Sequence, residues 1–376
     1  MNSPRDSASL RIAAFGFRSI PPRAGAAGSD HCSLQLFERM AARGHTVVCY
    51  NRLYGSERPS GSEYRGIRLV SFRTVNRRGY DTLLHSLKCT FHIIALNTGD
   101  IVQIANGGNS LWALVLRLFG KRVYVSQDGI DWKRKTWPWY GRLYLYISTY
   151  ITAWFPNQVV FDNVYAKEWF EKKFRRQFTF IPSGSELTDF REDDTVLRTM
   201  NLAAGDYFLF VGRFVPDKGL HHLIAAFARV ATAKKLVLVG GSPHPSEYEK
   251  SLRSTGDTRV LFPGFIYGND VLNLMKNAYA YIQPSEIEGL SPVMLSVMSL
   301  GTPLICSDIP ENAFVVGTHA LTFTSGSADS LAERITFALQ NPALLGSMAR
   351  QARARAGSQF SWEVAVDKHL SLYRGH

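Results

Sequence analysis

Short apolar runs alternate with helical patterns along the whole chain, and this alternation restricts the fold more than any other feature. Unbroken apolar strands that alternate with helices are typical of a parallel sheet covered on both faces. Helical patterns such as Ser33–Arg43 and His221–Ala231 separate many of the runs. The number of runs predicts two such sheets in an α/β protein. The candidate strands are Arg11–Phe15, Thr46–Asn51, Ile67–Phe72, Ile101–Ile104, Arg122–Ser126, Gln158–Phe161, Phe178–Ile181, Tyr207–Val211, Lys235–Val239, Val260–Phe262, Ala280–Gln283 and Pro303–Cys306.

The length of the chain also indicates two domains. It has 376 residues, whereas single hydrophobic cores stop growing at about 250–300 residues. The stretch Ser183–Gly205 is poor in apolar residues, so we place the boundary between the two domains there. Each half opens with a strand, a glycine and a basic residue: Gly16 with Arg18, and Gly212 with Arg213. We therefore expect two domains of one general design.

Charge and cysteine usage restrict the partners and the compartment. The formal net charge is +12, which favours an anionic partner such as a nucleotide, a nucleic acid or an acidic lipid. The cysteines at 32, 49, 89 and 306 form no CxxC pair, so free thiols in a reducing compartment are expected. No apolar run reaches the ~20 residues that a membrane span needs, and the polar start of the chain does not resemble a signal peptide. The expected location is the cytoplasm. Peripheral attachment to the inner face of the plasma membrane is an additional possibility.

The first segment with chemical content follows the strand Tyr207–Val211. Gly212 allows close backbone approach at the strand end. Arg213 and Lys218 would present two fixed cations able to clamp phosphate oxygens. Taken alone, the segment also fits an ordinary strand–loop–helix connection with solvated charges.

The second segment begins at Pro284 and contains Glu288 and Gly289 before an apolar helical pattern. Backbone N–H groups at a helix start bind anions, and a proline suits the first helical turn. A carboxylate cannot usefully face a phosphate, so Glu288 is predicted to face hydroxyl groups. Together the two segments indicate a sugar that carries a diphosphate. The amides expected to face the anion lie near Leu290, Ser291 and Val293.

Glu286 and Glu288 allow other interpretations. Two acids before a glycine fit a solvated loop, a general acid–base pair or a metal site. We discount the metal site because no further Asp or His ligand stands nearby in the sequence. His221 and His222 receive no role for the same reason.

Two loops of the N-terminal half also follow predicted strands. Gly16, Arg18 and Gly25 belong to a glycine- and proline-rich loop after the first strand, where a ligand role is favoured over simple flexibility. Asp128 and Asp131 follow the strand Arg122–Ser126. Asp128 is a candidate active-site acid, and a turn-initiating aspartate is an equal alternative.

Basic and aromatic residues are interleaved from Lys133 to Tyr146. This mixture suits an anionic membrane interface or a nucleic acid. A packed helix whose cations reach solvent is an equally serious alternative. No nucleic-acid recognition module is visible, so nucleic acid is not expected as a partner.

These residues resemble the retaining glycosyltransferases of family 4, which have the GT-B fold. The C-terminal match comprises Gly212-Arg213, Lys218-Gly219, Pro284-Ser285, Glu288-Gly289, Gly301-Thr-Pro303 and Ser307–Asn312. The N-terminal half looks like the rhamnosyltransferase-like branch through Gly16, Arg18–Pro21, Gly25, Arg43–Val47, Asp128–Trp132, Arg134 and Trp137. The resemblance implies two Rossmann-like doubly wound parallel-sheet domains that face a central cleft. It implies an acceptor-binding domain over residues 1–185, a nucleotide-sugar donor-binding domain over 186–355, and a C-terminal helix over 356–376 that packs back on the first domain.

The resemblance also assigns roles to residues. Arg213, Lys218 and Glu288 are the implied catalytic residues. Glu288 would hold the donor sugar hydroxyls. In the family a second glutamate, eight positions later, holds the ribose, and here that position is Ser296. The implied donor-binding residues are Gly16, Gly25, Gly212, Gly289, Leu290, Ser291, Val293 and Ser296, and the candidate acceptor or active-site residues are Arg18, Asp128 and Asp131.

The function implied is transfer, with retention, of a hexose or deoxyhexose from a nucleotide-diphosphate sugar. The acceptor would be a glycan or lipid-linked glycan in cell-surface polysaccharide synthesis. Neither a metal nor another cofactor is expected. The alternatives are a nucleotide-sugar epimerase and a non-catalytic sugar-nucleotide-binding protein of the same fold, the latter favoured by Ser296.

Overall fold

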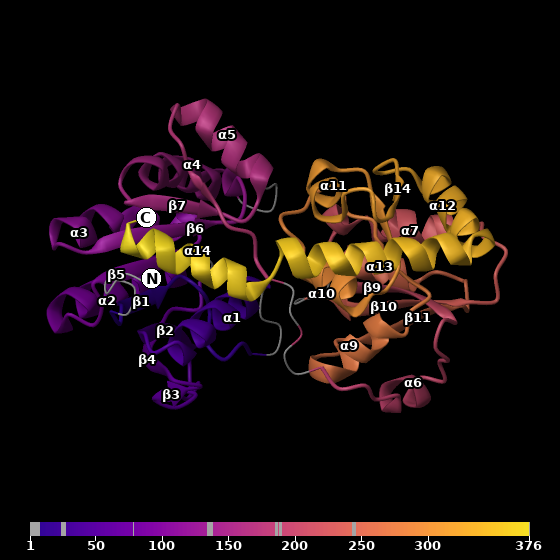
Figure 1. Cartoon of the computed structure of the whole chain (residues 1–376), viewed down its shortest axis with the longest axis horizontal. Coiled ribbons are helices and arrows are strands. Elements are labelled where there is room, and N and C mark those ends of the chain that lie inside the picture. Colours follow the sequence, from indigo (N-terminus) through magenta and orange to yellow (C-terminus); the bar gives the residue numbers. More distant parts are fainter. Residues whose placement is uncertain are drawn as a thin grey trace, which may run out of the picture. The chain divides into compact units, whose positions relative to one another are not determined.

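The structure is a computed structural model that describes residues 8–23, 28–77, 79–133, 138–184, 187, 190–242 and 246–375. The chain forms two compact units (Figure 1). Unit 1 comprises Met1–Ser183 and Trp362–His376, and unit 2 comprises Gly184–Ser361. The chain therefore passes from unit 1 to unit 2 where its apolar content falls, and it returns to unit 1 for the last helix.

Unit 1 is built on a sheet of eight described strands in the order β3-β4-β2-β1-β5-β6-β7-β8. All neighbours are parallel except the short β3, which pairs antiparallel with β4. The strands are β1 (Arg11–Phe15), β2 (Thr46–Tyr54), β3 (Glu63–Tyr64), β4 (Ile67–Thr74), β5 (Ile101–Ala105), β6 (Arg122–Gln127), β7 (Gln158–Phe161) and β8 (Thr179–Phe180).

Helices cover both faces of this sheet, which explains why its strands read as unbroken apolar runs. Ile12 and Ala14 of β1 face a core shared with α1 and α14, whereas Ala13 and Phe15 face a core shared with α2 to α5. The helices are α1 (Gly28–Ala42), α2 (Tyr80–Leu96), η2 (Gly107–Trp112), α3 (Ala113–Leu118), η3 (Asp131–Lys133), α4 (Trp139–Trp154), α5 (Val164–Phe174) and α14 (Trp362–Arg374).

The last helix, α14, is held in unit 1 by polar contacts as well as by packing. Arg43, directly after α1, pairs with Glu363 and, at 2.5 Å, with Asp367. The buried Tyr373 hydroxyl donates to Gln103 Oε1 of β5 at 2.7 Å. Residues at the two ends of the chain therefore share one core.

Unit 2 contains a parallel sheet of six described strands in the order β11-β10-β9-β12-β13-β14. Cores on both faces of the sheet are formed with its helices. The strands are β9 (Tyr207–Arg213), β10 (Lys235–Gly241), β11 (Val260–Gly264), β12 (Ala280–Gln283), β13 (Leu304–Ser307) and β14 (Leu321–Phe323). The helices are α6 (Thr195–Thr199), η4 (Pro216–Lys218), α7 (Leu220–Phe227), α8 (Glu247–Arg253), α9 (Gly268–Lys276), α10 (Pro292–Leu300), α11 (Pro310–Val316), α12 (Ala328–Gln340) and α13 (Pro342–Gln359).

The segment expected as one returning helix over 356–376 is divided between the units. Residues as far as Gln359 complete α13 of unit 2, and α14 begins only at Trp362. The physical reason is that two aromatic side chains close together in sequence are buried in different cores. Phe360 packs in the core of unit 2, and Trp362 packs in that of unit 1.

Candidate functional site

The topology of unit 2 places its most informative loops at one edge of the sheet. From β9 the chain continues to β10 and β11 on one side, then returns to β12, β13 and β14 on the other. Ligands of open parallel sheets bind at the carboxyl ends of the strands where the strand order reverses in this way. The loops after β9 and β12 carry the cations and the carboxylate that the sequence singled out.

Gly219 brings these two loops into backbone contact. Its φ is +65°, and a Cβ at this position would lie 2.1 Å from the Pro284 carbonyl oxygen. The Glu286 N–H donates to the Asp217 carbonyl at 3.0 Å. Only a glycine satisfies both the left-handed backbone and the close approach, so Gly219 is required for Lys218 to stand beside the loop after β12.

Lys218 and Glu288 form an ion pair at this contact. The Lys218 ammonium donates to Glu288 Oε1. The same oxygen accepts from the Ser285 hydroxyl at 2.7 Å and from the Gln283 amide. The Glu288 side chain is 8% exposed and that of Lys218 is 20% exposed. No described residue donates to the other oxygen, Oε2, which leaves that atom to accept from a ligand.

Buried polar side chains hold in place the residues that contact the Lys218–Glu288 ion pair. The Tyr281 hydroxyl donates to Gln283 Oε1 at 2.7 Å, and burial raises the pKa of Tyr281. The Ser307 hydroxyl donates to the Ser285 carbonyl, and Asn312 Nδ2 donates to Ser307 Oγ at 2.9 Å. Sequence reasoning gave Gln283 no role. A glutamine that ends the apolar run Ala280–Gln283, just before the Glu288 loop, was the available signal.

Arg213 differs from Lys218 in one respect that corrects the expectation of two fixed cations. Arg213 is exposed at the end of β9, and its guanidinium forms no hydrogen bond or ion pair with a described residue of unit 2. Only Lys218 is held in place. Gly212 precedes Arg213 in β9 and pairs in register with Gly240 of β10.

The start of α10 adjoins Glu288. Ser291 is the N-cap, and its side chain accepts from the Met294 N–H at 3.4 Å. Gly289, Leu290 and Val293 are half-buried around this turn. The Ser296 hydroxyl donates to the Pro292 carbonyl at 3.1 Å within the helix, so its proton is already used.

A second carboxyl group stands close to Glu288. Glu311 lies in the first turn of α11, and burial, followed by the nearby Glu288 carboxylate, raises the pKa of Glu311. The site therefore contains one carboxylate paired with an ammonium and one carboxyl group whose proton is held more tightly than usual.

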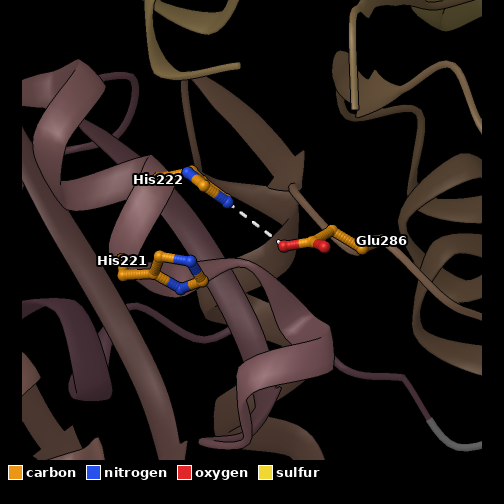
Figure 2. A group of neighbouring side chains, drawn as sticks. All are labelled: His221, His222 and Glu286. Carbon is orange, nitrogen blue, oxygen red and sulfur yellow. Dashed lines mark hydrogen bonds and ion pairs between the residues drawn. The ribbon is translucent and has the colours of Figure 1, made fainter. Parts of the chain in front are cut away.

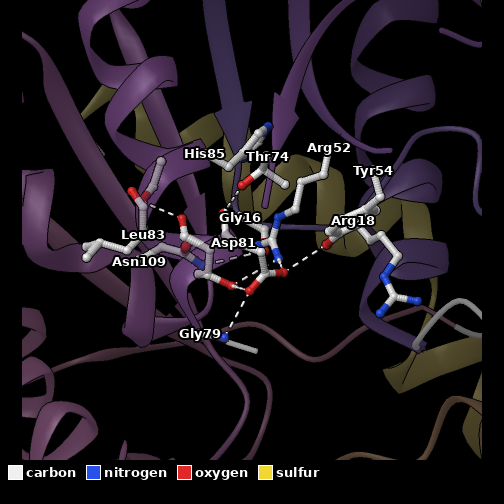
Figure 3. A network of polar contacts seen from close by, with 12 residues as sticks. Gly16, Arg18, Arg52, Tyr54, Thr74, Gly79, Asp81, Leu83, His85 and Asn109 are labelled. Carbon is white, nitrogen blue, oxygen red and sulfur yellow. Dashed lines mark hydrogen bonds and ion pairs between the residues drawn. The ribbon is translucent and has the colours of Figure 1, made fainter. Parts of the chain in front are cut away.

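In unit 1, Gly16 ends the first strand in a conformation that other residues would strain. Its φ is +111°, and a Cβ would lie 2.1 Å from the Ala105 carbonyl oxygen. A partly buried network fixes this turn (Figure 3). Arg52 donates to the Gly16 carbonyl at 3.0 Å and to Asp81 at 3.2 Å, while the Tyr54 hydroxyl donates to Asp81 at 2.8 Å. Sequence reasoning did not find Arg52 or Asp81, since neither adjoins a glycine motif.

The other N-terminal candidates lie beyond the carboxyl ends of β1 and β6, which are separated by β5 in the sheet. The Arg18 side chain is exposed, and its backbone N–H donates to the buried Asp30 carboxylate at 3.0 Å. Asp131 accepts from Gln127 Nε2 at 3.3 Å. Asp128, after β6, lies close to Asp162, after β7, and burial together with Asp128 raises the pKa of Asp162. Gly25 lies outside the described residues.

Two histidines given no role stand beside an acid after all. His222 Nε2 lies 3.1 Å from Glu286 Oε1, with His221 next to them (Figure 2). The sequence separation between α7 and the loop after β12 hid this group.

The four cysteines are free thiols, as the sequence predicted.

The basic and aromatic stretch is only partly a surface. Trp139 and Tyr140 are exposed, but the Tyr144 hydroxyl donates to the Gly108 carbonyl at 2.7 Å and Tyr146 packs edge-on to Trp132. Arg134, Lys135 and Trp137 lie outside the described residues. Across the described ranges, no helix has the length and apolar content to cross a membrane.

Comparison with solved structures identifies the fold. The chain resembles sucrose-phosphate synthase from Thermosynechococcus elongatus with a TM-score of 0.82 and 22% identity, over 97% of this chain and 98% of that one. HepE of Anabaena in complex with UDP-glucose matches with a TM-score of 0.79 and 17% identity, over 97% and 100%. With its two parallel-sheet α/β units, the chain has the GT-B fold that the sequence predicted.

Sequence comparison adds a family match for part of unit 2. Residues 203–355, within unit 2, match the model of the family described as "Glycosyl transferases group 1". O-antigen chain mannosyltransferase B of Escherichia coli is 26% identical over 185 residues, 48% of each chain. The MMP alpha-(1->4)-mannosyltransferase of Mycolicibacterium hassiacum is 24% identical over 85% of this chain and 75% of that protein. The matches to O-antigen chain mannosyltransferases B and C span about half the length of those relatives.

Proposed function

We propose that the chain is a retaining glycosyltransferase of the family 4 type. It would move a hexose or deoxyhexose from a nucleotide-diphosphate sugar to a glycan or lipid-linked glycan in cell-surface polysaccharide synthesis. The observation that carries the proposal is the Lys218–Glu288 pair at the point in unit 2 where the strand order reverses. Support comes from the glycosyl transferase family match of unit 2 and from the HepE structure with UDP-glucose.

The geometry favours a division of labour within the donor site. Glu288 Oε1 is occupied by three donors, so Oε2 would accept from the sugar hydroxyls. Lys218 is already neutralised by Glu288, so a diphosphate needs further positive charge. Arg213, with no described side-chain partner, would supply it together with the amides near Leu290 and Val293.

The chemistry then follows from where charge develops. Breaking the anomeric C–O bond leaves positive charge on the sugar and negative charge on the departing diphosphate. Pre-placed cations and dipoles stabilise that leaving group. The departing phosphate would take the acceptor proton, and neither a metal nor another cofactor takes part in transfer. In unit 1, Arg18, Asp128 and Asp131 are proposed to contact the acceptor, and Gly16 is proposed as a donor-binding residue.

The test is donor turnover by the unaltered chain and by Glu288→Gln. Incubation with a panel of nucleotide sugars should release nucleoside diphosphate only when a glycan acceptor is present. Glu288→Gln should bind nucleoside diphosphate as before but transfer poorly, because the change affects the sugar and not the nucleoside. Turnover of donor to an epimer without acceptor would support an epimerase. Tight binding without any turnover would support a non-catalytic binding protein.

We further propose that unit 1 meets an anionic membrane, through a larger surface than the stretch from Lys133 to Tyr146. The helices α2, α3 and α4 cover one face of its sheet. Their only acidic residue is Asp81, which pairs with Arg52. Most of the large apolar side chains exposed in the described residues lie here: Tyr80, Phe91, Leu96, Leu114, Leu118, Phe119, Trp139, Tyr140, Leu143, Ile147, Tyr150 and Trp154.

Liposome sedimentation tests this surface. Binding should require acidic lipid and fall with salt, because attraction to surface charge is screened within a Debye length of about 10 Å at 0.1 M. Leu118→Glu with Ile147→Glu should abolish binding. The matched control is Leu344→Glu, which alters an exposed apolar residue of unit 2. Equal binding by both variants, or binding to neutral lipid alone, would refute the assignment.

A further inference from the structure

We propose that His221, His222 and Glu286 bind a divalent transition-metal ion of the zinc class, which ties the start of α7 to the loop after β12. One ligand atom from each residue lies within 4.8 Å of the other two. His222 Nε2 and Glu286 Oε1 are 3.1 Å apart. In Figure 2 the His222 ring points at the Glu286 carboxylate. The His221 ring lies beside the His222 ring, and both belong to α7.

The ligand set suits this class of ion. Zinc takes imidazole nitrogens and carboxylate oxygens, and three protein ligands plus water complete its four-coordinate shell. Ligand bonds of about 2.0–2.2 Å in a tetrahedral shell hold the ligand atoms roughly 3.3–3.5 Å from one another. The His222–Glu286 pair is already near this spacing. His221 and Glu286 are exposed, so small side-chain rotations can close the remaining gaps.

The surroundings prepare the two imidazoles for an ion. Metals bind the neutral imidazole through a ring nitrogen that carries no proton. Both rings stand in the first turn of α7, on one side of the contact with the loop after β12. The Tyr248 hydroxyl lies 2.9 Å from His221 Nδ1 and can accept a hydrogen bond from Nδ1–H. This bond orients the imidazole ring and leaves Nε2 as the nitrogen that binds an ion.

The position of the group gives the ion a role. Lys218 and Gly219 lead directly into α7, and Glu286 is two residues before Glu288. An ion held by both segments would cross-link the loops that form the Lys218–Glu288 pair, in addition to their single backbone hydrogen bond from Glu286 to Asp217. Metal binding would therefore stabilise unit 2 and hold the donor-site loops in their paired arrangement.

The experiment uses the full chain without an affinity tag, because a histidine tag binds the same ions. Calorimetry with Zn²⁺ should show one equivalent bound, and Co²⁺ should give the visible absorption of a tetrahedral site. His222→Ala and Glu286→Gln should each weaken Zn²⁺ binding at least tenfold. The matched control is His319→Ala, which removes a half-buried histidine bonded only to Gln351 among the described side chains.

Zinc binding can also be detected through the melting temperature, independently of donor transfer. Zn²⁺ should raise the melting temperature of the unaltered chain, chelation should reverse the rise, and His222→Ala should show none. The altered side chains are exposed or half-buried and none belongs to the described cores, so far-UV circular dichroism is expected to be unchanged. No zinc binding by the untagged chain, or equal binding in His222→Ala and Glu286→Gln, would overturn the proposal. Either result would leave donor transfer untouched, since transfer is proposed to need no metal.

Discussion

Replacing Lys218 by methionine removes the cation from a largely buried carboxylate while keeping most of the side-chain volume. Glu288 would remain 8% exposed, with only Ser285 and Gln283 as donors. Breaking a buried ion pair by removing one partner costs about 3–5 kcal/mol. Lys218 keeps 20% exposure and two neutral donors remain, so we expect the lower end of that range, about 3 kcal/mol.

The double variant separates this effect from lost packing. The double variant Lys218→Met with Glu288→Gln leaves no unpaired charge. Its loss in free energy of unfolding should therefore be about 2 kcal/mol smaller than the sum of the losses in the two single variants. Independent sites add to within about 0.3–0.5 kcal/mol. Additivity within that margin would refute the claim that the buried carboxylate depends on Lys218.

The assay exploits the distribution of tryptophan. All seven tryptophans lie outside residues 184–361, so their fluorescence reports on unit 1, whereas far-UV circular dichroism reports on both units. Urea unfolding of the single and double variants should therefore shift the dichroism transition of unit 2. The fluorescence transition of unit 1 serves as the internal control and should stay in place.

Three further predictions concern other residues. Arg213→Ala should lower kcat/KM by roughly 2–4 kcal/mol of transition-state stabilisation, the scale for one preorganised charge contact; near-normal kcat/KM with every accepted donor would remove Arg213 from the site. Ser296→Glu should tighten nucleoside diphosphate binding in calorimetry by adding a carboxylate for the ribose, and unchanged affinity in a folded variant would show that the ribose is held elsewhere. Burial lowers the pKa of His369 to about 4, so the unfolded chain binds its proton first and stability falls as pH drops from about 6.5 towards 4. His369→Gln should flatten the pH dependence of tryptophan-detected unfolding by about 1.4 kcal/mol per pH unit in that window, and identical slopes in the two proteins would exclude this histidine.

The sequence was sufficient for the strands because burial on both faces leaves a signal that does not depend on neighbours. The runs at Arg11–Phe15, Gln158–Phe161 and Ala280–Gln283 coincide with β1, β7 and β12. The very short β3 and β14 were missed, since two or three residues carry too little pattern. The bound of 356 that the resemblance implied for the C-terminal helix lies before α14, because a family likeness does not tell which core receives Phe360 and which receives Trp362.

For the candidate site, the sequence determined the residue types and the tertiary structure determined their partners. Gly212, Arg213, Lys218 and Glu288 could be selected because strand ends and helix starts are local features. That Lys218 is bound to Glu288, that Arg213 is not held, and that His222 meets Glu286 could not be read in this way. These contacts join the loops after β9 and β12, and only the formation of the sheet brings those loops to one edge.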